Sequence, residues 1–245
     1  MAMPRLKRET VDILGARFPV VVVALVGLTV ALSVIGAMGW RNGVRVVLER
    51  GALVPGLVWA GQIWRLFTWT FFELDPLSLI FWAMIMLFFG RELYYVWGRR
   101  RFVALYVGIS AAAGAVTSVA AYFWPAVLSQ SYISAWPLAE AFTVAWAVLF
   151  PSRQILLYFV LPVGGRTLLY LTVGGVLLFA LMQGFAPYLP HFTAMLLMLA
   201  YLGEFNLRTS WLRLRYWTLS HSLRRRTSHL KVVGKEEDRH SRWVH

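Results

Sequence analysis

The sequence predicts an all-α integral membrane protein, a bundle of six transmembrane helices. Of its 245 residues, 59% are apolar and only 14% are charged, whereas soluble domains contain about half apolar and about a quarter charged residues. The apolar residues are concentrated in runs, several of them long enough to cross the ~30 Å hydrocarbon core of a bilayer. Lysine and arginine are concentrated in alternate connections between these runs. Together these observations indicate a polytopic membrane protein rather than a soluble domain.

The N-terminal region predicts a basic segment followed by one span. Residues 1–17 are polar and basic, and the run from Phe18 to about Trp40 contains no charged residue. This run is too long for the apolar part of a cleavable signal peptide and lacks a small-residue cleavage site after it, so we interpret it as a retained first span. Residues 41–65 mix arginine and glutamate with apolar residues, a pattern typical of a loop at the membrane interface.

Five further apolar runs complete the predicted bundle. They cover about 66–90, 102–124, a stretch that ends near 150, about 167–185 and about 191–205. An apolar segment at 155–163 is too short to span the bilayer, so we expect it at the interface. The predicted domains are therefore a basic cytoplasmic N-terminus (1–17), a six-span membrane domain (18–207) and a basic cytoplasmic tail (208–245).

The distribution of basic residues predicts the orientation of the bundle. With six spans and the N-terminus inside, the inner segments hold 20 lysines and arginines, and the outer segments hold four. Such an excess follows the positive-inside rule. We therefore expect both termini in the cytoplasm, and a multi-pass protein of a bacterial inner (plasma) membrane.

The net charge of +13 predicts negatively charged partners. The tail residues Arg224, Arg225 and Arg226 predict contact with anionic membrane lipids at the cytoplasmic face, where each basic residue contributes about 1 kcal/mol. Because the membrane accounts for these charges, no nucleic acid is expected as a partner. The absence of cysteine excludes disulfides and thiol chemistry. Without a phosphate-binding loop, a dinucleotide fingerprint or a metal-ligand cluster, we expect no cofactor and no metal.

Three stretches of the chain resemble the rhomboid family of intramembrane serine proteases. The first, 62–72, contains the Trp-Arg pair with which the second span opens in that family. The second, 87–106, contains Gly-Arg-Glu-Leu, Trp-Gly and a basic-Phe step, and the third, 149–163, resembles the family's link between the fourth and fifth spans. The resemblance covers roughly residues 61–215 and implies a rhomboid-like bundle of six transmembrane helices.

The matched motifs have plausible physical roles. The Trp-Arg pair can place a ring and a charge at the outer interface. The Arg-Glu pair can end the second span at the inner face through an ion pair or a carboxylate–backbone bond, and the Trp-Gly step allows a tight return. The residues for which we expect these structural or partner-contact roles are Trp64, Arg65, Arg91, Glu92, Trp97 and Gly98.

The positions that carry catalysis in the rhomboid family hold other residues here. The resemblance implies a nucleophilic serine on the fourth span, a histidine base on the sixth, and a histidine and an asparagine on the second that stabilise the oxyanion. In this sequence the corresponding residues are Trp136, Met195, Ser78 and Trp82. Large apolar side chains at three of these positions would fill a water-accessible cleft. We therefore expect no proteolysis and no other enzymatic activity.

Two features leave alternatives open. A non-standard dyad of Ser134 or Ser131 with His191 would restore a nucleophile and a base. Glu140 is a carboxylate well inside a predicted span, where a charge costs at least ~2.5 kcal/mol. We expect it either to hydrogen-bond a neighbouring helix or to contact a partner helix or polar substrate.

Two classes of function remain compatible with the sequence. In the first, the protein is a non-enzymatic accessory or structural subunit of a larger membrane protein complex. In the second, it is a rhomboid pseudoprotease that binds transmembrane segments of client proteins for quality control or trafficking, as the resemblance implies. The bulky residues at the catalytic positions favour the first class, because a client binder should keep its cavity open. Both predict other integral membrane proteins as partners.

Overall fold

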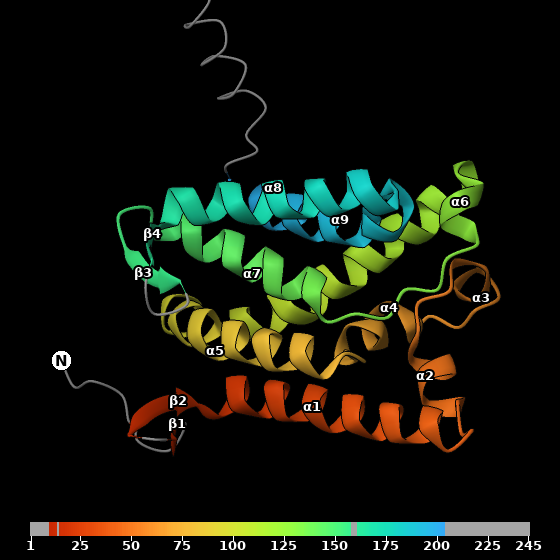
Figure 1. The fold of residues 1–245 in the computed structure, drawn as a ribbon, viewed down its shortest axis with the longest axis horizontal. Helices are drawn as coiled ribbons and strands as arrows, with labels where there is room; N and C mark the ends of the chain where they lie inside the picture. The colour runs from red at the N-terminus through yellow and green to blue at the C-terminus, as the bar shows by residue number, and fades with distance from the viewer. Residues whose placement is uncertain (1–9, 14, 158–160, 204–245) are drawn as a thin grey trace, which may run out of the picture. The chain divides into compact units, whose positions relative to one another are not determined.

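The computed structural model describes residues 10–13, 15–157 and 161–203, and these form a helical membrane domain (Figure 1). Three helices are long and apolar enough to cross a membrane: Val20–Arg41, Pro76–Phe123 and Gly165–Gln183. The predicted class, an all-α integral membrane protein, is therefore confirmed. The helices and strands are β1 (Thr10–Ile13), β2 (Ala16–Pro19), α1 (Val20–Arg41), α2 (Val46–Gly51), α3 (Pro55–Trp59), α4 (Arg65–Thr68), η2 (Trp69–Phe71), α5 (Pro76–Phe123), α6 (Pro125–Leu128), α7 (Trp136–Leu149), β3 (Gln154–Leu157), β4 (Leu161–Gly164), α8 (Gly165–Gln183) and α9 (Phe185–Tyr201).

The long helix α5 consists of two helical halves joined at Gly98. This glycine has a φ of 73°, a conformation that costs other residues roughly 1–2 kcal/mol. The chain reverses direction here, so that 76–97 and 99–123 run back along each other (Figure 1). The tight return expected of the Trp-Gly step therefore separates the two helical halves of α5.

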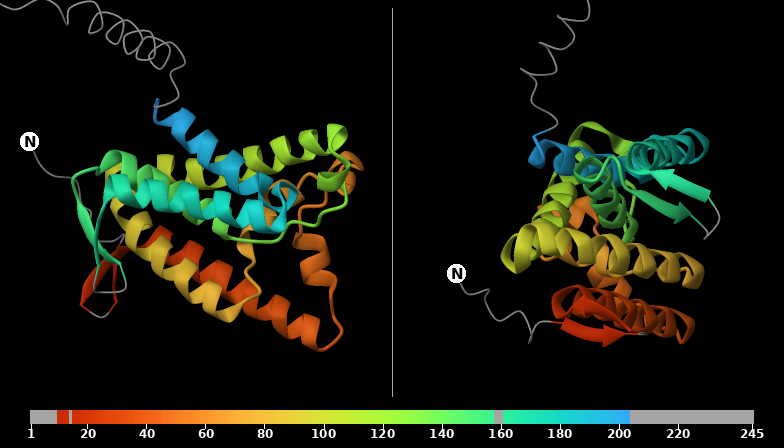
Figure 2. Two further views of the ribbon diagram at one scale, coloured as in Figure 1. Left: turned by 45° about the horizontal axis from the view of Figure 1, so that its top comes forward. Right: turned by 90° about the vertical axis from the view of Figure 1, so that its left-hand side faces the viewer.

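Helix α7 lies at the centre of the bundle. It is flanked by α5 on one side and by α8 and α9 on the other (Figure 1). Ten of its 14 residues are buried, among them four alanines, and such small side chains let neighbouring helices approach closely. Helix α1 packs against α5 on the far side from α7 (Figure 2). Helix α7 is thus enclosed along most of its length by the other helices.

The second apolar run begins as a long helix ten residues later than the sequence predicts. Residues 65–71 form α4 and η2, and α5 starts only at Pro76. The Asp75 side chain accepts a hydrogen bond of 2.6 Å from the backbone N–H of Ser78, which caps the helix, and proline favours the first helical position. The helix of the last run begins earlier than predicted, because α9 starts at Phe185 rather than near His191.

The number of spans stays a prediction. Helix α7 has 14 residues, which at 1.5 Å per residue is about 21 Å, shorter than the ~30 Å hydrocarbon core. Helix α9 has 17 residues and contains Pro190. Among the described residues, six longer helical segments are present if the halves of α5 are counted separately, and three helices, one of them the whole of α5, have the length and composition of a span.

The connections contain more regular structure than the sequence predicts. The first loop forms α2, α3 and α4, and is joined to the chain before α7 by a backbone bridge between Leu53 and Tyr132. Of the segment expected at the interface, 155–163, residues 155–157 lie in β3 and 161–163 in β4, which pair as antiparallel strands; 158–160 lie outside the described residues. A second hairpin, β1–β2, lies in the basic N-terminal region. Both hairpins lie at the end of the bundle opposite α2 and α3 (Figures 1 and 2).

Replacing Gly165 by alanine is expected to destabilise the domain by about 1–3 kcal/mol, the usual range for overpacking. An added Cβ would lie 2.6 Å from the carbonyl oxygen of Phe150 and 3.0 Å from that of Ala147. These are backbone atoms at the end of α7 and cannot swing away. The measurement is unfolding by SDS titration, followed by circular dichroism.

Gly164→Ala is the matched control for this substitution. Its Cβ would meet no atom within 4 Å, and its φ of −75° suits any residue. Equal losses of stability in the two variants would contradict the close contact between Gly165 and the end of α7.

Candidate functional site

Trp82 is the residue that the sequence resemblance aligns with the oxyanion asparagine of the rhomboid family. Its side chain is fully buried in the main apolar core. The indole Nε1–H donates a hydrogen bond of 2.9 Å to the carbonyl oxygen of Ala135, the residue before α7. The ring therefore fills the space between α5 and α7 and gives a short hydrogen bond to a carbonyl oxygen that also accepts one of 3.5 Å from the backbone N–H of Ala139.

The other three catalytic positions lie in different surroundings. Trp136 is the first residue of α7 and is half-buried against the main core. Ser78 lies in the first turn of α5, where its N–H is bound by Asp75. Met195 is buried on α9 in a separate apolar cluster with Val144 and Val176. The structure thus places Trp82 beside the start of α7, whereas Met195 lies in a different apolar cluster from Trp82.

A polar network fixes the chain just before α7. The Ser134 hydroxyl donates a hydrogen bond of 3.0 Å to Glu73 Oε2 and accepts one of 3.2 Å from the backbone N–H of Trp136. The backbone N–H of Ser134 also donates to the carbonyl oxygen of Trp69. Glu73 therefore connects the segment before α5 to the segment before α7, at the end of the bundle that holds α2 and α3.

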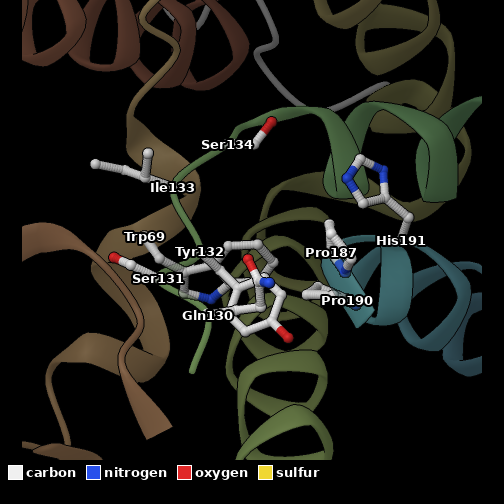
Figure 3. Close-up of a pocket in the computed structure, with 9 residues that line it drawn as sticks. All are labelled: Trp69, Gln130, Ser131, Tyr132, Ile133, Ser134, Pro187, Pro190 and His191. Carbon is white, nitrogen blue, oxygen red and sulfur yellow. The ribbon is translucent and has the colours of Figure 1, made fainter. Parts of the chain in front are cut away.

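A small cavity of about 150 Å³ opens beside this network. Tyr132 contributes to its wall and donates a hydrogen bond of 2.9 Å to the carbonyl oxygen of Ala186, while burial raises the pKa of its phenol to about 12. The nine lining residues are drawn in Figure 3, and they are Trp69, Gln130, Ser131, Tyr132, Ile133, Ser134, Pro187, Pro190 and His191. The cavity can hold a few water molecules, but it is smaller than the ~300–1,000 Å³ of ordinary ligand pockets.

Glu140 and His191 form a pair between α7 and α9. The distance between Glu140 Oε2 and His191 Nδ1 is 2.8 Å, and both side chains are less than 15% exposed. The imidazole ring also lies 5.2 Å from the ring of Tyr188. The single carboxylate within α7 is therefore satisfied inside the chain by a neighbouring helix, and a partner that bound Glu140 would have to displace this histidine.

The structure does not bring a serine and a histidine together as a dyad. Ser134 and Ser131 line the same cavity as His191, but the Ser134 hydroxyl does not point at the imidazole ring (Figure 3). Within residues 10–13, 15–157 and 161–203, no hydrogen bond joins His191 to either serine; the histidine is bound to Glu140 and Ser134 to Glu73. A nucleophile needs a base within hydrogen-bonding reach, so this geometry is not that of an activated serine.

The pKa of the Glu73 carboxyl is raised above its ordinary value of 4.5, first because burial disfavours the charged form. The folded protein therefore retains this proton at a pH where the unfolded chain has released it, and the free energy of unfolding falls as the pH rises above about 4.5. Glu73→Gln should remove this part of the pH dependence. The measurement is thermal unfolding in detergent between pH 4 and pH 8.

Glu49→Gln, at an exposed carboxylate of α2, is the control for Glu73→Gln and should leave the profile unchanged. A Glu73→Gln profile that parallels the wild-type profile would show that this carboxyl is not the group responsible.

The buried side chain of Arg65 joins parts of the first loop through hydrogen bonds. The residue is only 4% exposed, and its guanidinium donates to the carbonyl oxygens of Glu49 and Ala52 and to Gln62 Oε1. Burial lowers the pKa of this guanidinium. The carbonyl oxygens of Glu49 and Ala52 thus bind the Arg65 guanidinium within the loop, and the position of this charge at the membrane interface stays a prediction. The neighbouring Trp64 is about half exposed at the start of α4.

Glu92 connects three parts of the opposite end of the bundle. Its Oε2 accepts a hydrogen bond of 2.6 Å from Trp146 Nε1 on α7 and one of 2.7 Å from Arg153 Nη1 in the following link. Glu92 therefore forms an ion pair, as expected at the end of the second run, and its partner is Arg153. Trp146 and Arg153 could not be predicted as the partners, because they lie more than 50 residues away along the chain.

The remaining matched residues make ring contacts near the kink. The Arg91 guanidinium lies 5.4 Å from the centre of the Phe18 ring, between α5 and β2. Trp97 is half-buried and contacts the rings of Phe142 and Tyr201 edge to face. These contacts tie the kink to α7 and α9.

Sequence reasoning missed the roles of Glu73 and Tyr132. Both lie in short connections, and their partners, Ser134 and the carbonyl oxygen of Ala186, are 61 and 54 residues away along the chain. The expected lipid contacts Arg224, Arg225 and Arg226 lie outside the described residues. Within the described part of the chain, no group of three histidine or acidic side chains could hold a metal ion.

Comparison with known protein families identifies one match. Residues 19–236 match the family described as "Eukaryotic integral membrane protein (DUF1751)". None of the curated proteins matches the chain. The family description contradicts the expected location in a bacterial inner membrane; the positive-inside count on which that expectation rested reports orientation and carries no information about the organism. Because the match covers most of the 245 residues, from the start of α1 beyond the end of α9, the chain belongs to this family of eukaryotic integral membrane proteins.

Proposed function

We propose that this protein is a catalytically inactive, rhomboid-like membrane protein that serves as a structural subunit of a larger membrane protein complex. The observation that carries the proposal is the burial of Trp82, whose indole is bonded to the backbone immediately before α7. A hydrolase needs an open, hydrated cleft and free oxyanion donors at this point. Here the position holds a packed aromatic ring.

The surroundings of the catalytic positions support the same proposal. The neighbouring cavity measures about 150 Å³, too small to admit an extended peptide or a transmembrane helix, whose diameter is about 10 Å. Ser134 and His191 are each engaged with a carboxylate of this chain. A bundle with this interior can present fixed outer surfaces to other subunits, but offers little internal room for a substrate.

The outer surface of α8 is suited to contact with other membrane helices or with lipid. Large apolar side chains project from it over its whole length, and those more than half exposed are Tyr170, Leu171, Leu178, Phe179, Leu181 and Met182. Only four of its 19 residues are buried in the chain itself. This helix is therefore the first surface on which to seek a permanent partner.

The second candidate function is the binding of transmembrane segments of client proteins. One observation favours it: His191 of the Glu140–His191 pair lines the cavity, so that this polar pair lies beside it. Polar groups inside membrane helices are expensive and often mark sites of recognition. A polar side chain in the membrane segment of a client could replace Glu140 or His191 as the hydrogen-bond partner within this pair.

Purification from the native membrane in a mild detergent distinguishes the two functions. A structural subunit should co-purify with one set of partners at a fixed molar ratio, measured by quantitative mass spectrometry. Replacing exposed Leu178 and Leu181 of α8 by tryptophan should then reduce that ratio, whereas the same change at exposed Val119 on α5 should not. Co-purification of many different membrane proteins at low and variable molar ratios would exclude the function of a structural subunit and favour client binding.

A further inference from the structure

We propose that a groove between α1 and the second half of α5 binds one anionic phospholipid, with its headgroup at Arg100 and an acyl chain along the apolar floor. This site is separate from the catalytic positions and does not depend on the proposed function. The groove has a volume of about 660 Å³, within the ~300–1,000 Å³ range of ordinary ligand sites.

The groove is apolar along its length and basic at one end. Helix α1 lines it from Val20 to Leu28, a rise of about 12 Å at 1.5 Å per residue. Helix α5 contributes Arg99 and Arg100 immediately after the kink, and then Ala104. Both helical segments start from the same end of the bundle, so the two guanidinium groups lie at the level where α1 begins.

Small side chains open the groove between the two helices. Ala24 on α1 and Ala104 on α5 are both exposed and line it. Val20 and Leu28 are 40% and 46% exposed, although they belong to the most apolar helix of the domain. In a bilayer such an exposed apolar surface contacts acyl chains.

The charge at the basic end selects the class of lipid. Arg100 is exposed and lines the groove together with Arg99, and a third guanidinium, that of Arg91, lies over Phe18, two residues before Val20. Guanidinium groups bind phosphate oxygens through paired hydrogen bonds, and basic pockets between membrane helices recognise anionic headgroups. No acidic residue lines this groove, so a net negative headgroup complements it better than a zwitterionic one.

The test is lipid binding to the full purified chain in neutral detergent. Phosphatidylserine or phosphatidylcholine with the same acyl chains is titrated in mixed micelles, and binding is measured by native mass spectrometry and by the shift in melting temperature. Phosphatidylserine should bind at least about fivefold more tightly than phosphatidylcholine, the factor that corresponds to about 1 kcal/mol per basic residue. Inorganic phosphate alone should neither bind nor compete, because the groove also requires the acyl chain.

Two substitutions with matched controls locate the site. Arg100→Gln should weaken phosphatidylserine binding about fivefold, while Arg101→Gln, which removes the same charge one residue away and outside the groove, should not. Ala104→Phe should obstruct the acyl chain without changing charge, and Val119→Phe, on an exposed part of the same helix, is its control. Equal binding of the two lipids, equal effects of Arg100→Gln and Arg101→Gln, or full competition by phosphate would each overturn the proposal. A protein segment bound in the groove would likewise overturn it, and would appear as a co-purifying chain released by Ala104→Phe.

Discussion

Replacing Trp82 by alanine should lower the free energy of unfolding by about 3–5 kcal/mol, the range for a large aromatic residue in a packed core. The side chain is fully buried, and its removal also takes from the carbonyl oxygen of Ala135 the shorter of its two hydrogen bonds, leaving the one of 3.5 Å from the backbone N–H of Ala139. Other rings of the same core would have to move to fill the cavity left by Trp82. Those of Phe89 and Trp146, for example, would lose their contact with each other. SDS titration followed by circular dichroism measures the loss.

Trp64→Ala is the control for Trp82→Ala, because this tryptophan is 49% exposed. Its loss should change the stability by less than about 1 kcal/mol. If both variants were equally stable, Trp82 would not be filling the position between α5 and α7, and the central argument for an occupied interior would fail.

Replacing Arg65 by methionine should destabilise the domain by about 2–4 kcal/mol. Methionine keeps much of the side-chain volume but removes the donors to the carbonyl oxygens of Glu49 and Ala52. Buried acceptors left without partners cost about 1–3 kcal/mol each, and hydrogen bonds from a charged group are the stronger ones. The first loop should also become accessible to limited proteolysis between α1 and α4.

Two further variants are the controls for Arg65→Met. Arg50→Met removes a charge from an exposed position of the same loop and should be nearly neutral. Arg65→Lys keeps the charge but loses the planar fork that reaches several acceptors at once, so it should recover only part of the stability. Full recovery by lysine would show that charge alone matters and would contradict the hydrogen-bonded account.

The membrane class and most helical segments could be predicted because hydropathy and charge are local properties of the sequence. The apolar run at Val20–Arg41 is one helix, and the glycine between two helical runs is the point of reversal. Helix ends were less predictable. The run near Leu66 is interrupted because a capping aspartate and a proline restart the helix at Pro76, and this local competition outweighs apolar composition.

The partners within the candidate site could not be predicted, because they depend on how distant segments come together. Glu140 was identified from its unusual position, but only the packing of α7 against α9 supplies His191. Arg65 was identified from a motif, yet its orientation into the loop follows from the carbonyls that α2 leaves free at its end. Glu73 falls near the start of the predicted run 66–90, and only the packing of the segment before α7 against it supplies its partner, Ser134.

The most direct test of the account is labelling of the purified full chain with a fluorophosphonate, which reacts covalently with activated serines. The account predicts no labelling of Ser134 or Ser131, because Ser134 is bonded to Glu73 and the histidine to Glu140. Wild type, Ser134→Ala and His191→Ala should be indistinguishable, and none should cleave a transmembrane substrate reporter. Labelling of either serine that His191→Ala abolishes would contradict the account and establish a working nucleophile.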